Sequence, residues 1–312
     1  MGFECVSPQE VAHVREILPS IEKERILFTP NFAPRHEYEE GIALGCNLTL
    51  DAIFPLRMWP EIFANQKLII RIDTGKGKGH HKYVVTAGSQ SKFGIPPQDL
   101  EELCTLVDKH NIHVVGLHAH AGSGIRDAQN WAEKAEYLQS LRVHFPEVEI
   151  LNLGGGFGVP ERPGEDRLKI DEVNVSLQAF RAMVPDVSLW IEPGRYLVAE
   201  AGVLVSKVTQ LKSKGERVYV GTDVGMNTLI RPALYGAYHH IENLSKWGKK
   251  RSIVADVVGP ICESGDVLGR GRALPETQNG DLLAVGTAGA YGRSMSSQYN
   301  LRAPAQELWF EE

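Results

Sequence analysis

Three short stretches of the chain carry side chains of the kinds that enzymes use, and each follows a run of strand-forming residues. In VVGLHAHAGSG, His118 and His120 stand at alternate positions, so both imidazoles point to the same side of a strand. Ser123 and Gly124 then open a turn of small residues, the kind of turn that hydrogen-bonds an anion. A histidine at a strand end is commonly structural, and the adjoining turn favours a functional role here.

The stretch LNLGGGFGVP ends a strand-like run in three consecutive glycines. Glycine loses more backbone entropy on folding than any other residue, so such a run indicates that a bare backbone is needed. One explanation is that the N–H groups of Gly154, Gly155 and Gly156 approach an anion, most commonly a phosphate. The other is a tight turn, for which one or two glycines would be enough.

The stretch LWIEPGRYLVAEAG holds an acid and a guanidinium on one bend. Pro193 and Gly194 favour a turn between Glu192 and Arg195. The simple interpretation is an exposed Glu–Arg ion pair worth less than about 1 kcal/mol. The functional interpretation is a ligand that is anionic at one end and carries a protonated nitrogen at the other. Pyridoxal 5′-phosphate (PLP) answers to that description.

Strands and helices alternate over the first two-thirds of the chain, which predicts parallel strands joined by helical crossovers. Several strands are apolar throughout, as expected when both faces are covered. The predicted strands are residues 2–6, 26–30, 47–51, 68–73, 114–120, 150–156 and 189–195. Helical periodicity is clear over 100–110 and 128–145.

In a parallel (β/α)8 TIM-type barrel, the chemistry gathers at the C-terminal ends of the strands. The residues there are Asp73, the two histidines, the three glycines, and Glu192 with Arg195. Seven strands are visible where such a barrel has eight, and the first begins at residue 2. The α/β fold is therefore either an open doubly wound sheet or a TIM-type barrel whose first strand is missing and lies upstream of Met1.

After Ala201 the pattern changes to strands separated by turns, which predicts an antiparallel β domain. Its predicted strands are residues 203–211, 217–223, 252–262, 281–287 and 306–310. We therefore expect residues 1–200 to form a PLP-binding α/β barrel domain and residues 201–312 a C-terminal β domain. Residues 75–79 (GKGKG) lack the spacing of a phosphate-binding P-loop and are expected to be a mobile loop.

The composition is that of an ordinary globular protein, with 43% hydrophobic and 23% charged residues and a formal net charge of −6. Without a long basic run, neither nucleic acid nor a membrane surface is expected as a partner. No apolar run approaches the roughly 20 residues needed to cross a bilayer. The N-terminus does not resemble a signal peptide, and we expect a cytoplasmic protein.

The four cysteines, Cys5, Cys46, Cys104 and Cys262, are scattered and form no CxxC pair. This spacing argues against a disulfide scaffold and against a structural zinc site, so no metal is expected. Reducing conditions, as in the cytoplasm, fit this usage best.

Six motifs together resemble the alanine racemase-like, fold-type III PLP enzymes, and specifically the diaminopimelate decarboxylases. They are HAHAGSG, LNLGGGFG, IEPGRY, TDVGMNTLIRPALYGAYH, VVGPICESGDVLG and GAYGRSMSSQYN, in family order over nearly the whole chain. The stretch ERILFTPNFAPRHEYEEGIALGCNLTLD is most similar to the decarboxylase half of bifunctional aspartate kinase/diaminopimelate decarboxylases. A fused kinase domain upstream is therefore a further expectation.

The resemblance implies a role for each matching residue in holding the cofactor. His120 would stack on the PLP ring, and Glu192 would face the pyridine nitrogen. The phosphate would be held by Ser123, by the backbone of Gly154, Gly155 and Gly156, and by Tyr291. Pro193 and Gly194 shape the turn, and Arg195 closes it at the phosphate and substrate end.

The resemblance also implies how an amino-acid substrate is bound. Arg231 and Tyr235 would grip a substrate carboxylate, and an arginine offers a bidentate fork that a lysine does not. Cys262 and Glu263 would reach the active site of the other subunit of a homodimer. There Cys262 would donate a proton and Glu263 would recognise the distal ammonium group.

The chemistry of these residue types agrees with decarboxylation. A carboxylate beside the pyridine nitrogen favours its protonated form, so the ring accepts the electrons released as CO₂ leaves. Racemases of this fold keep that nitrogen neutral with an arginine, so Glu192 favours a decarboxylase. Free thiols are mostly protonated at neutral pH, which suits Cys262 as a proton donor. A buried, apolar role is the alternative for this cysteine.

The family holds PLP as a Schiff base on a lysine in a YAxKAN-type motif on the first barrel strand, and this sequence contains no such motif. Lys67, Lys76, Lys78 and Lys82 lie in segments that match other parts of the family. The chain is therefore expected to be a truncated decarboxylase with little or no turnover. The alternative is a lysine-less, non-catalytic homologue that acts as a binding or regulatory protein.

The expected reaction of the family is the decarboxylation of meso-2,6-diaminopimelate to L-lysine in lysine biosynthesis. An arginine- or ornithine-type decarboxylase of the same fold is the alternative enzyme. Glu263 and RPALY speak against it, because these features suit a substrate with a second amino-acid head group.

Overall fold

The computed structural model describes residues 1–75 and 91–310 of the chain, which form two compact units. The first unit consists of Met1–Phe157 and Leu168–Pro193, and the second of Gly158–Arg167 and Gly194–Glu312. The domain boundary that the sequence predicts at residue 200 stays a prediction. Most of the predicted loop at 75–79 lies outside the described residues.

The first unit is built on a sheet of seven parallel strands whose order in space is their order in the chain, β1 to β7. The strands are β1 (Phe3–Cys5), β2 (Ile26–Phe28), β3 (Asn47–Leu50), β4 (Lys67–Arg71), β5 (His113–His118), β6 (Ile150–Asn152) and β7 (Ser188–Trp190). All seven predicted strands are confirmed, as is the curled parallel α/β architecture. No pairing within the described residues joins β7 to β1.

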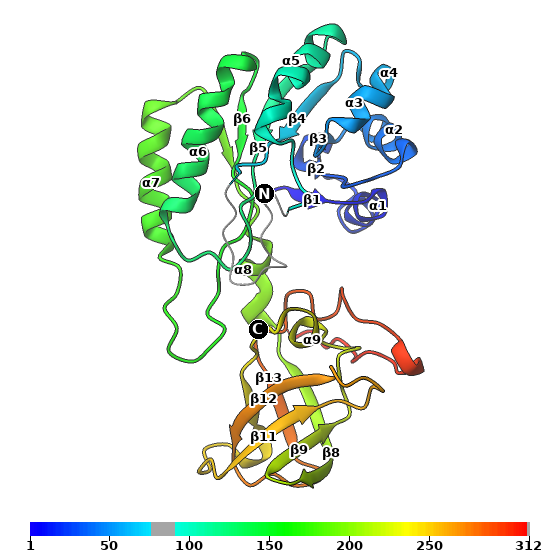
Figure 1. The fold of residues 1–312 in the computed structure, drawn as a ribbon, viewed down its shortest axis with the longest axis vertical. Coiled ribbons are helices and arrows are strands. Elements are labelled where there is room, and N and C mark those ends of the chain that lie inside the picture. Colours follow the sequence, from blue (N-terminus) through cyan, green and yellow to red (C-terminus); the bar gives the residue numbers. More distant parts are fainter. Residues whose placement is uncertain (76–90, 311–312) are drawn as a thin grey trace. The chain divides into compact units, whose positions relative to one another are not determined.

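Helices connect these strands and lie along the outside of the sheet (Figure 1). They are α1 (Pro8–Ile17), α2 (Arg35–Leu44), α3 (Phe54–Met58), α4 (Pro60–Phe63), α5 (Leu100–Lys109), α6 (Gln129–Leu141) and α7 (Ile170–Met183). The helical segments expected at 100–110 and 128–145 correspond to α5 and to α6 with the short 3-10 turn Arg142–His144.

Local sequence explains where α1 and α2 begin and end. Ser7 caps α1 by accepting the Glu10 N–H at 3.2 Å, and the Glu10 carboxylate accepts the Val6 N–H at 2.7 Å. Helix α2 ends at Gly45, whose φ of +68° is left-handed backbone that glycine adopts without steric cost. These caps satisfy N–H and C=O groups that a helix leaves unpaired at its ends.

The second unit contains a six-stranded sheet in the order β10-β13-β8-β9-β11-β12. The strands are β8 (Leu204–Lys214), β9 (Arg217–Thr222), β10 (Ile241–Asn243), β11 (Ile253–Val258), β12 (Val267–Leu274) and β13 (Leu282–Val285), with two short helices, α8 (Gly194–Val198) and α9 (Arg231–Tyr235). The pairings are antiparallel as predicted, except that β9 and β11 run parallel. The core of the sheet includes Val208, Val257, Leu268 and Leu283.

The sequence prediction for this unit is wrong at one strand and omits two others. Residues 306–310 are not a strand, and Leu308, Trp309 and Phe310 are between 75% and 91% exposed. A β-strand needs a neighbouring strand for its backbone hydrogen bonds, and no strand among the described residues pairs with this segment. The sequence also misses β10, which is only three residues long, and β12, whose two glycines and two arginines weaken the strand pattern.

No helix in the described part of the chain is both long and apolar enough to span a membrane. Within residues 1–75 and 91–310, His, Cys, Asp and Glu form no group of three or more suited to hold a metal ion. Each of the four cysteines is a free thiol.

Adjacent leucines on β13 provide a test of the second core. Leu283 is fully buried, whereas Leu282 faces outward and is 42% exposed. We expect Leu283→Ala to lower the free energy of unfolding by about 2–5 kcal/mol, because it leaves a cavity among close-packed side chains. Leu282→Ala should cost less than about 1 kcal/mol. Urea denaturation of both variants measures these losses of stability. Equal losses would contradict the assignment of Leu283 to the core and of Leu282 to the surface.

Candidate active site

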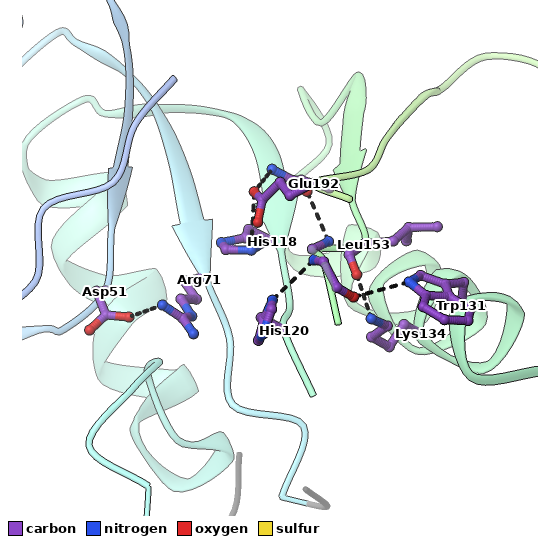
Figure 2. Close-up of polar contacts among 11 residues, drawn as sticks. Asp51, Arg71, His118, His120, Trp131, Lys134, Leu153 and Glu192 are labelled. Carbon is purple, nitrogen blue, oxygen red and sulfur yellow. Dashed lines mark hydrogen bonds and ion pairs between the residues drawn. The ribbon is translucent and has the colours of Figure 1, made fainter. Parts of the chain in front are cut away.

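In the first unit, the ends of three neighbouring strands bring together residues that lie far apart in the sequence. His118 ends β5, the glycine loop follows β6, and Glu192 follows β7. Figure 2 shows His118, His120 and Glu192 around the glycine loop. Parallel strands place their C-terminal ends at one edge, and this juxtaposition follows from that geometry.

Glu192 accepts a hydrogen bond from Asn152, at the end of β6, and lies close to His118. The side-chain amide of Asn152 donates to the Glu192 Oε1 atom at 2.7 Å, and His118 Nε2 lies 3.6 Å from the same oxygen. The side chain of Glu192 is 17% exposed. Desolvation raises the pKa of Glu192, and the Asn152 hydrogen bond opposes this rise. A positively charged partner would therefore stabilise the ionised form of this carboxylate.

Both histidines are neutral in this environment. The Gly155 N–H donates to His120 Nδ1 at 3.0 Å, so in the neutral ring the proton is on Nε2. Desolvation and the charge of Arg71 lower the pKa of His120 to about 3. The same two causes lower the pKa of His118, which is 2% exposed, well below its ordinary value. Neither ring is suited to act as a cation at neutral pH.

The three glycines are required by the backbone itself. Gly154 and Gly156 have φ values of +63° and +88°. A Cβ atom on Gly155 would lie 2.3 Å from the Glu192 carbonyl oxygen, and one on Gly156 would lie 2.3 Å from the Gly122 carbonyl oxygen. The Gly154 N–H donates to Asn152 Oδ1 at 2.9 Å, and the Gly155 N–H donates to His120. Close packing thus accounts for the glycine run, and its role at a phosphate stays a prediction.

Helix α6 supports this loop through two residues that the sequence did not single out. Trp131 Nε1 donates to the Gly155 carbonyl at 3.3 Å, and the Lys134 ammonium donates to the Leu153 carbonyl (Figure 2). Both side chains are buried. Nothing in the helical pattern of α6 distinguishes a buried lysine from an exposed one, so only the structure could reveal this contact.

Arg71 and Asp51 form a buried ion pair near the histidines. Arg71, at the end of β4, is 3.3 Å from Asp51 through its Nη1 atom, and both side chains are at most 10% exposed. Desolvation raises the pKa of Asp51 to about 6 although Arg71 opposes the rise.

The second unit contains a separate cluster around two predicted arginines. Arg195, in α8, and Arg231, in α9, are 8% and 5% exposed. Both donate to the Glu161 Oε1 atom, at 3.2 Å and 3.5 Å respectively. Tyr291 has a φ of +64°, which is unusual for a residue with a side chain. Sequence analysis did not identify Glu161.

Cys262 and Glu263 lie on an exposed loop that is tied to the last described segment of the chain. The Cys262 N–H donates to Asn300 Oδ1 at 2.9 Å, and the Tyr299 hydroxyl donates to Glu263 Oε1 at 2.6 Å. Asp266 accepts the N–H groups of Met226 and Ile261 and so joins the loop to the preceding TDVGMN segment. The thiol of Cys262 is exposed, which differs from the buried, apolar alternative.

The remaining predicted site residues lie in the same segments. Ser123, Pro193 and Tyr235 are half-buried, and Gly194 is exposed at the start of α8. Tyr235 ends α9, four residues after Arg231. The roles of these residues in binding stay predictions.

Gly155 offers a test of the close approach between two strand ends. We expect Gly155→Ala to lower the free energy of unfolding by about 2–4 kcal/mol, because the methyl group overlaps the Glu192 carbonyl and displaces the backbone. Gly265→Ala is the control, since nothing lies within 4 Å of its Cβ position. Thermal and urea unfolding measure both changes, and an unaffected Gly155→Ala protein would contradict this explanation of the glycine run.

The neutral imidazole of His120 makes stability depend on pH. Its folded-state pKa of about 3 lies below the ordinary value of about 6.5. The stabilisation is therefore present above pH 6.5 and is lost as the pH falls toward 3. Between pH 6 and 4, His120→Gln should reduce the slope of stability against pH by up to about 1.4 kcal/mol per pH unit. Urea denaturation at several pH values measures it, and an unchanged slope would show that His120 protonates freely in the folded protein.

Comparisons with known proteins identify a family for the chain. The family model described as pyridoxal-dependent decarboxylase, pyridoxal binding domain, matches residues 1–199. The diaminopimelate decarboxylase of Methanothermobacter thermautotrophicus is 36% identical, over 100% of this chain and 75% of that protein. The diaminopimelate decarboxylase of Escherichia coli K12 is 33% identical, over 94% of this chain and 74% of that protein.

Solved structures show the same relationship. The diaminopimelate decarboxylase of Helicobacter pylori, complexed with L-lysine, matches with a TM-score of 0.84 at 30% identity, over 97% of this chain and 77% of that one. An arginine decarboxylase from Paramecium bursaria Chlorella virus has a TM-score of 0.83 at 21% identity, which is a likeness of fold alone. The chain therefore belongs to the diaminopimelate decarboxylase family of PLP-dependent decarboxylases.

Proposed function

We propose that the substrate of this decarboxylase is meso-2,6-diaminopimelate and that its products are L-lysine and CO₂. The observation that carries the proposal is the Glu192 carboxylate, which accepts a hydrogen bond from Asn152 and lies beside the neutral rings of His118 and His120. The relatives named above as diaminopimelate decarboxylases support the choice of substrate.

The residues present fit non-covalent binding of PLP. Desolvation raises the pKa of Glu192 by more than Asn152, Arg71 and Lys134 lower it, and a protonated pyridine nitrogen would stabilise its ionised form further. Arg195 has two buried nitrogen atoms, Nε and Nη2, that have no hydrogen-bond partner in the described part of the chain, and these suit the oxygens of a phosphate. When bound, PLP supplies the electron sink for decarboxylation. Ser123, Tyr291 and the glycine loop complete the proposed set of cofactor ligands.

The residues that we propose to bind the substrate belong to the second unit. Arg231 and Tyr235 bind a carboxylate of the substrate, and Glu263 binds its distal ammonium. The Cys262 thiol delivers a proton to Cα after CO₂ leaves. Cys262 and Glu263 are exposed, which supports the proposal that they act in the second subunit of a homodimer. A fused kinase domain also remains a proposal.

Because the sequence contains no YAxKAN-type lysine, we also propose that this chain has a low rate of decarboxylation. Lys134 is buried and its ammonium donates to the Leu153 carbonyl, so it is poorly placed to replace a lysine of the cofactor site. We therefore expect this chain by itself to bind PLP without efficient turnover. A chain extended at its N-terminus by the lysine-bearing segment of a relative should be active.

A CO₂-release assay with PLP tests the substrate. The extended chain should release CO₂ from meso-diaminopimelate, and from L-arginine or L-ornithine at less than about 1% of that rate, since a missing polar head leaves buried groups unpaired. Faster release from arginine or ornithine would favour the other decarboxylase type. Equal rates for the extended and unextended chains would contradict the need for the lysine. PLP binding to both chains without any CO₂ release would favour the binding-protein alternative.

The same assay tests the proton donor. In the extended chain, Cys262→Ala should lower kcat by about 100-fold or more, which is the contribution typical of a positioned general acid. Cys104→Ala is the matched control, because Cys104 lies on α5, is half-buried and has no proposed role in the reaction. Equal rates for the two variants would remove Cys262 from the mechanism.

A further inference from the structure

Two buried guanidinium groups in the second unit share one carboxylate. Glu161 Oε1 accepts from Arg195 Nη1 at 3.2 Å and from Arg231 Nη2 at 3.5 Å. The side chains of the two arginines are 7% and 6% exposed, and that of Glu161 is 17% exposed. Glu161 belongs to the segment Gly158–Arg167, which lies between β6 and α7 in the sequence but is part of the second unit.

His239 holds Arg231 from another direction. Its Nε2 atom is 3.2 Å from Arg231 Nη1, and its Nδ1 atom is 2.9 Å from the Gly286 carbonyl oxygen. Because a carbonyl only accepts, Nδ1 carries the proton and Nε2 accepts from the arginine. The ring is fully buried, and desolvation lowers the pKa of His239 to about 4, so the ring is neutral at neutral pH. Glu161 and His239 together leave Arg231 little freedom to rotate.

The cluster is nevertheless incomplete. Arg195 Nε and Nη2 are buried and have no hydrogen-bond partner among residues 1–75 and 91–310. Buried donors are rarely left unpaired, because each costs about 1–3 kcal/mol. Two guanidiniums facing one carboxylate also leave an excess of positive charge. An oxyanion, either a phosphate or a carboxylate, supplies both the missing acceptors and the missing charge.

We propose that Glu161 is the resident counter-ion of a two-arginine oxyanion site, and that Glu161 and His239 are its positioning residues. Glu161 keeps the two guanidiniums together when no anion is bound, and His239 fixes the direction of Arg231. This inference rests on the proposed function only in that the oxyanion would belong to the cofactor or the substrate. The arrangement itself is a property of the second unit.

The charge of Glu161 can be tested on the chain as it exists, without any assay of decarboxylation. We expect Glu161→Gln to lower Tm in sodium chloride by about 3 °C or more, because two buried cations lose their counter-ion. Sodium phosphate at the same ionic strength should restore most of this loss, so that the phosphate-dependent rise in Tm is at least twice that of the wild type. A loss of packing alone would not be restored by an anion.

Two variants serve as matched controls. Glu161→Asp keeps the charge and should respond to phosphate as the wild type does. Glu200→Gln removes the carboxylate of the exposed Arg167–Glu200 ion pair in the same unit and should show no additional response to phosphate. Sodium acetate replaces phosphate in a second series, and a rise in Tm there identifies a carboxylate rather than a phosphate as the preferred oxyanion.

The role of His239 is tested by the concentration of anion needed for half of the rise in Tm. His239→Gln retains an acceptor for Arg231 and should need a concentration close to that of the wild type. His239→Phe removes the acceptor and should need a concentration about tenfold higher. The proposal is overturned if Glu161→Gln responds to phosphate and to acetate no more than Glu200→Gln does, or if it stays insoluble in both salts. These Tm measurements do not depend on CO₂ release. The proposed function and the proposed oxyanion site can therefore be refuted independently of each other.

Discussion

The candidate site in the first unit depends on how closely two strand ends approach each other. At Gly155 the backbone after β6 lies so near the Glu192 carbonyl that a Cβ atom would be 2.3 Å from it. This approach allows Glu192 N–H to donate to the Gly154 carbonyl at 3.1 Å and sets Glu192 beside Asn152. A methyl group at this point would separate the strand ends and move the carboxylate away from its partners.

Desolvation then decides the charge of each side chain around this contact. The histidines are neutral because burial and nearby cations disfavour their protonated forms. Glu192 and Asp51 are pushed toward their protonated forms, and hydrogen bonds or Arg71 oppose that push. A site with these properties favours a ligand that brings its own positive nitrogen. In the second unit, Arg195 and Arg231 share the single carboxylate of Glu161. The excess charge there is positive, so an oxyanion is favoured.

The lysine is the exception to an otherwise complete set of family residues. Residues that match the cofactor and substrate motifs are all present among the described residues, yet the sequence contains no YAxKAN-type motif. Seven strands pair in sequence order without a described pairing between the first and the last.

Much of this protein followed from the order of its residues. Apolar runs bounded by turns located all seven parallel strands, and GGG, EPGR and HAH marked the strand ends that carry chemistry, because side-chain period and glycine conformation are local properties. The sequence also specified the family. It did not reveal Glu161, His239, Asn152 or Lys134, whose importance comes from partners between 8 and 70 positions away. Nor could it show that residues 306–310 lack a neighbouring strand. Only the tertiary structure decided which polar groups are buried together, since burial and pairing depend on distances that a linear pattern does not contain.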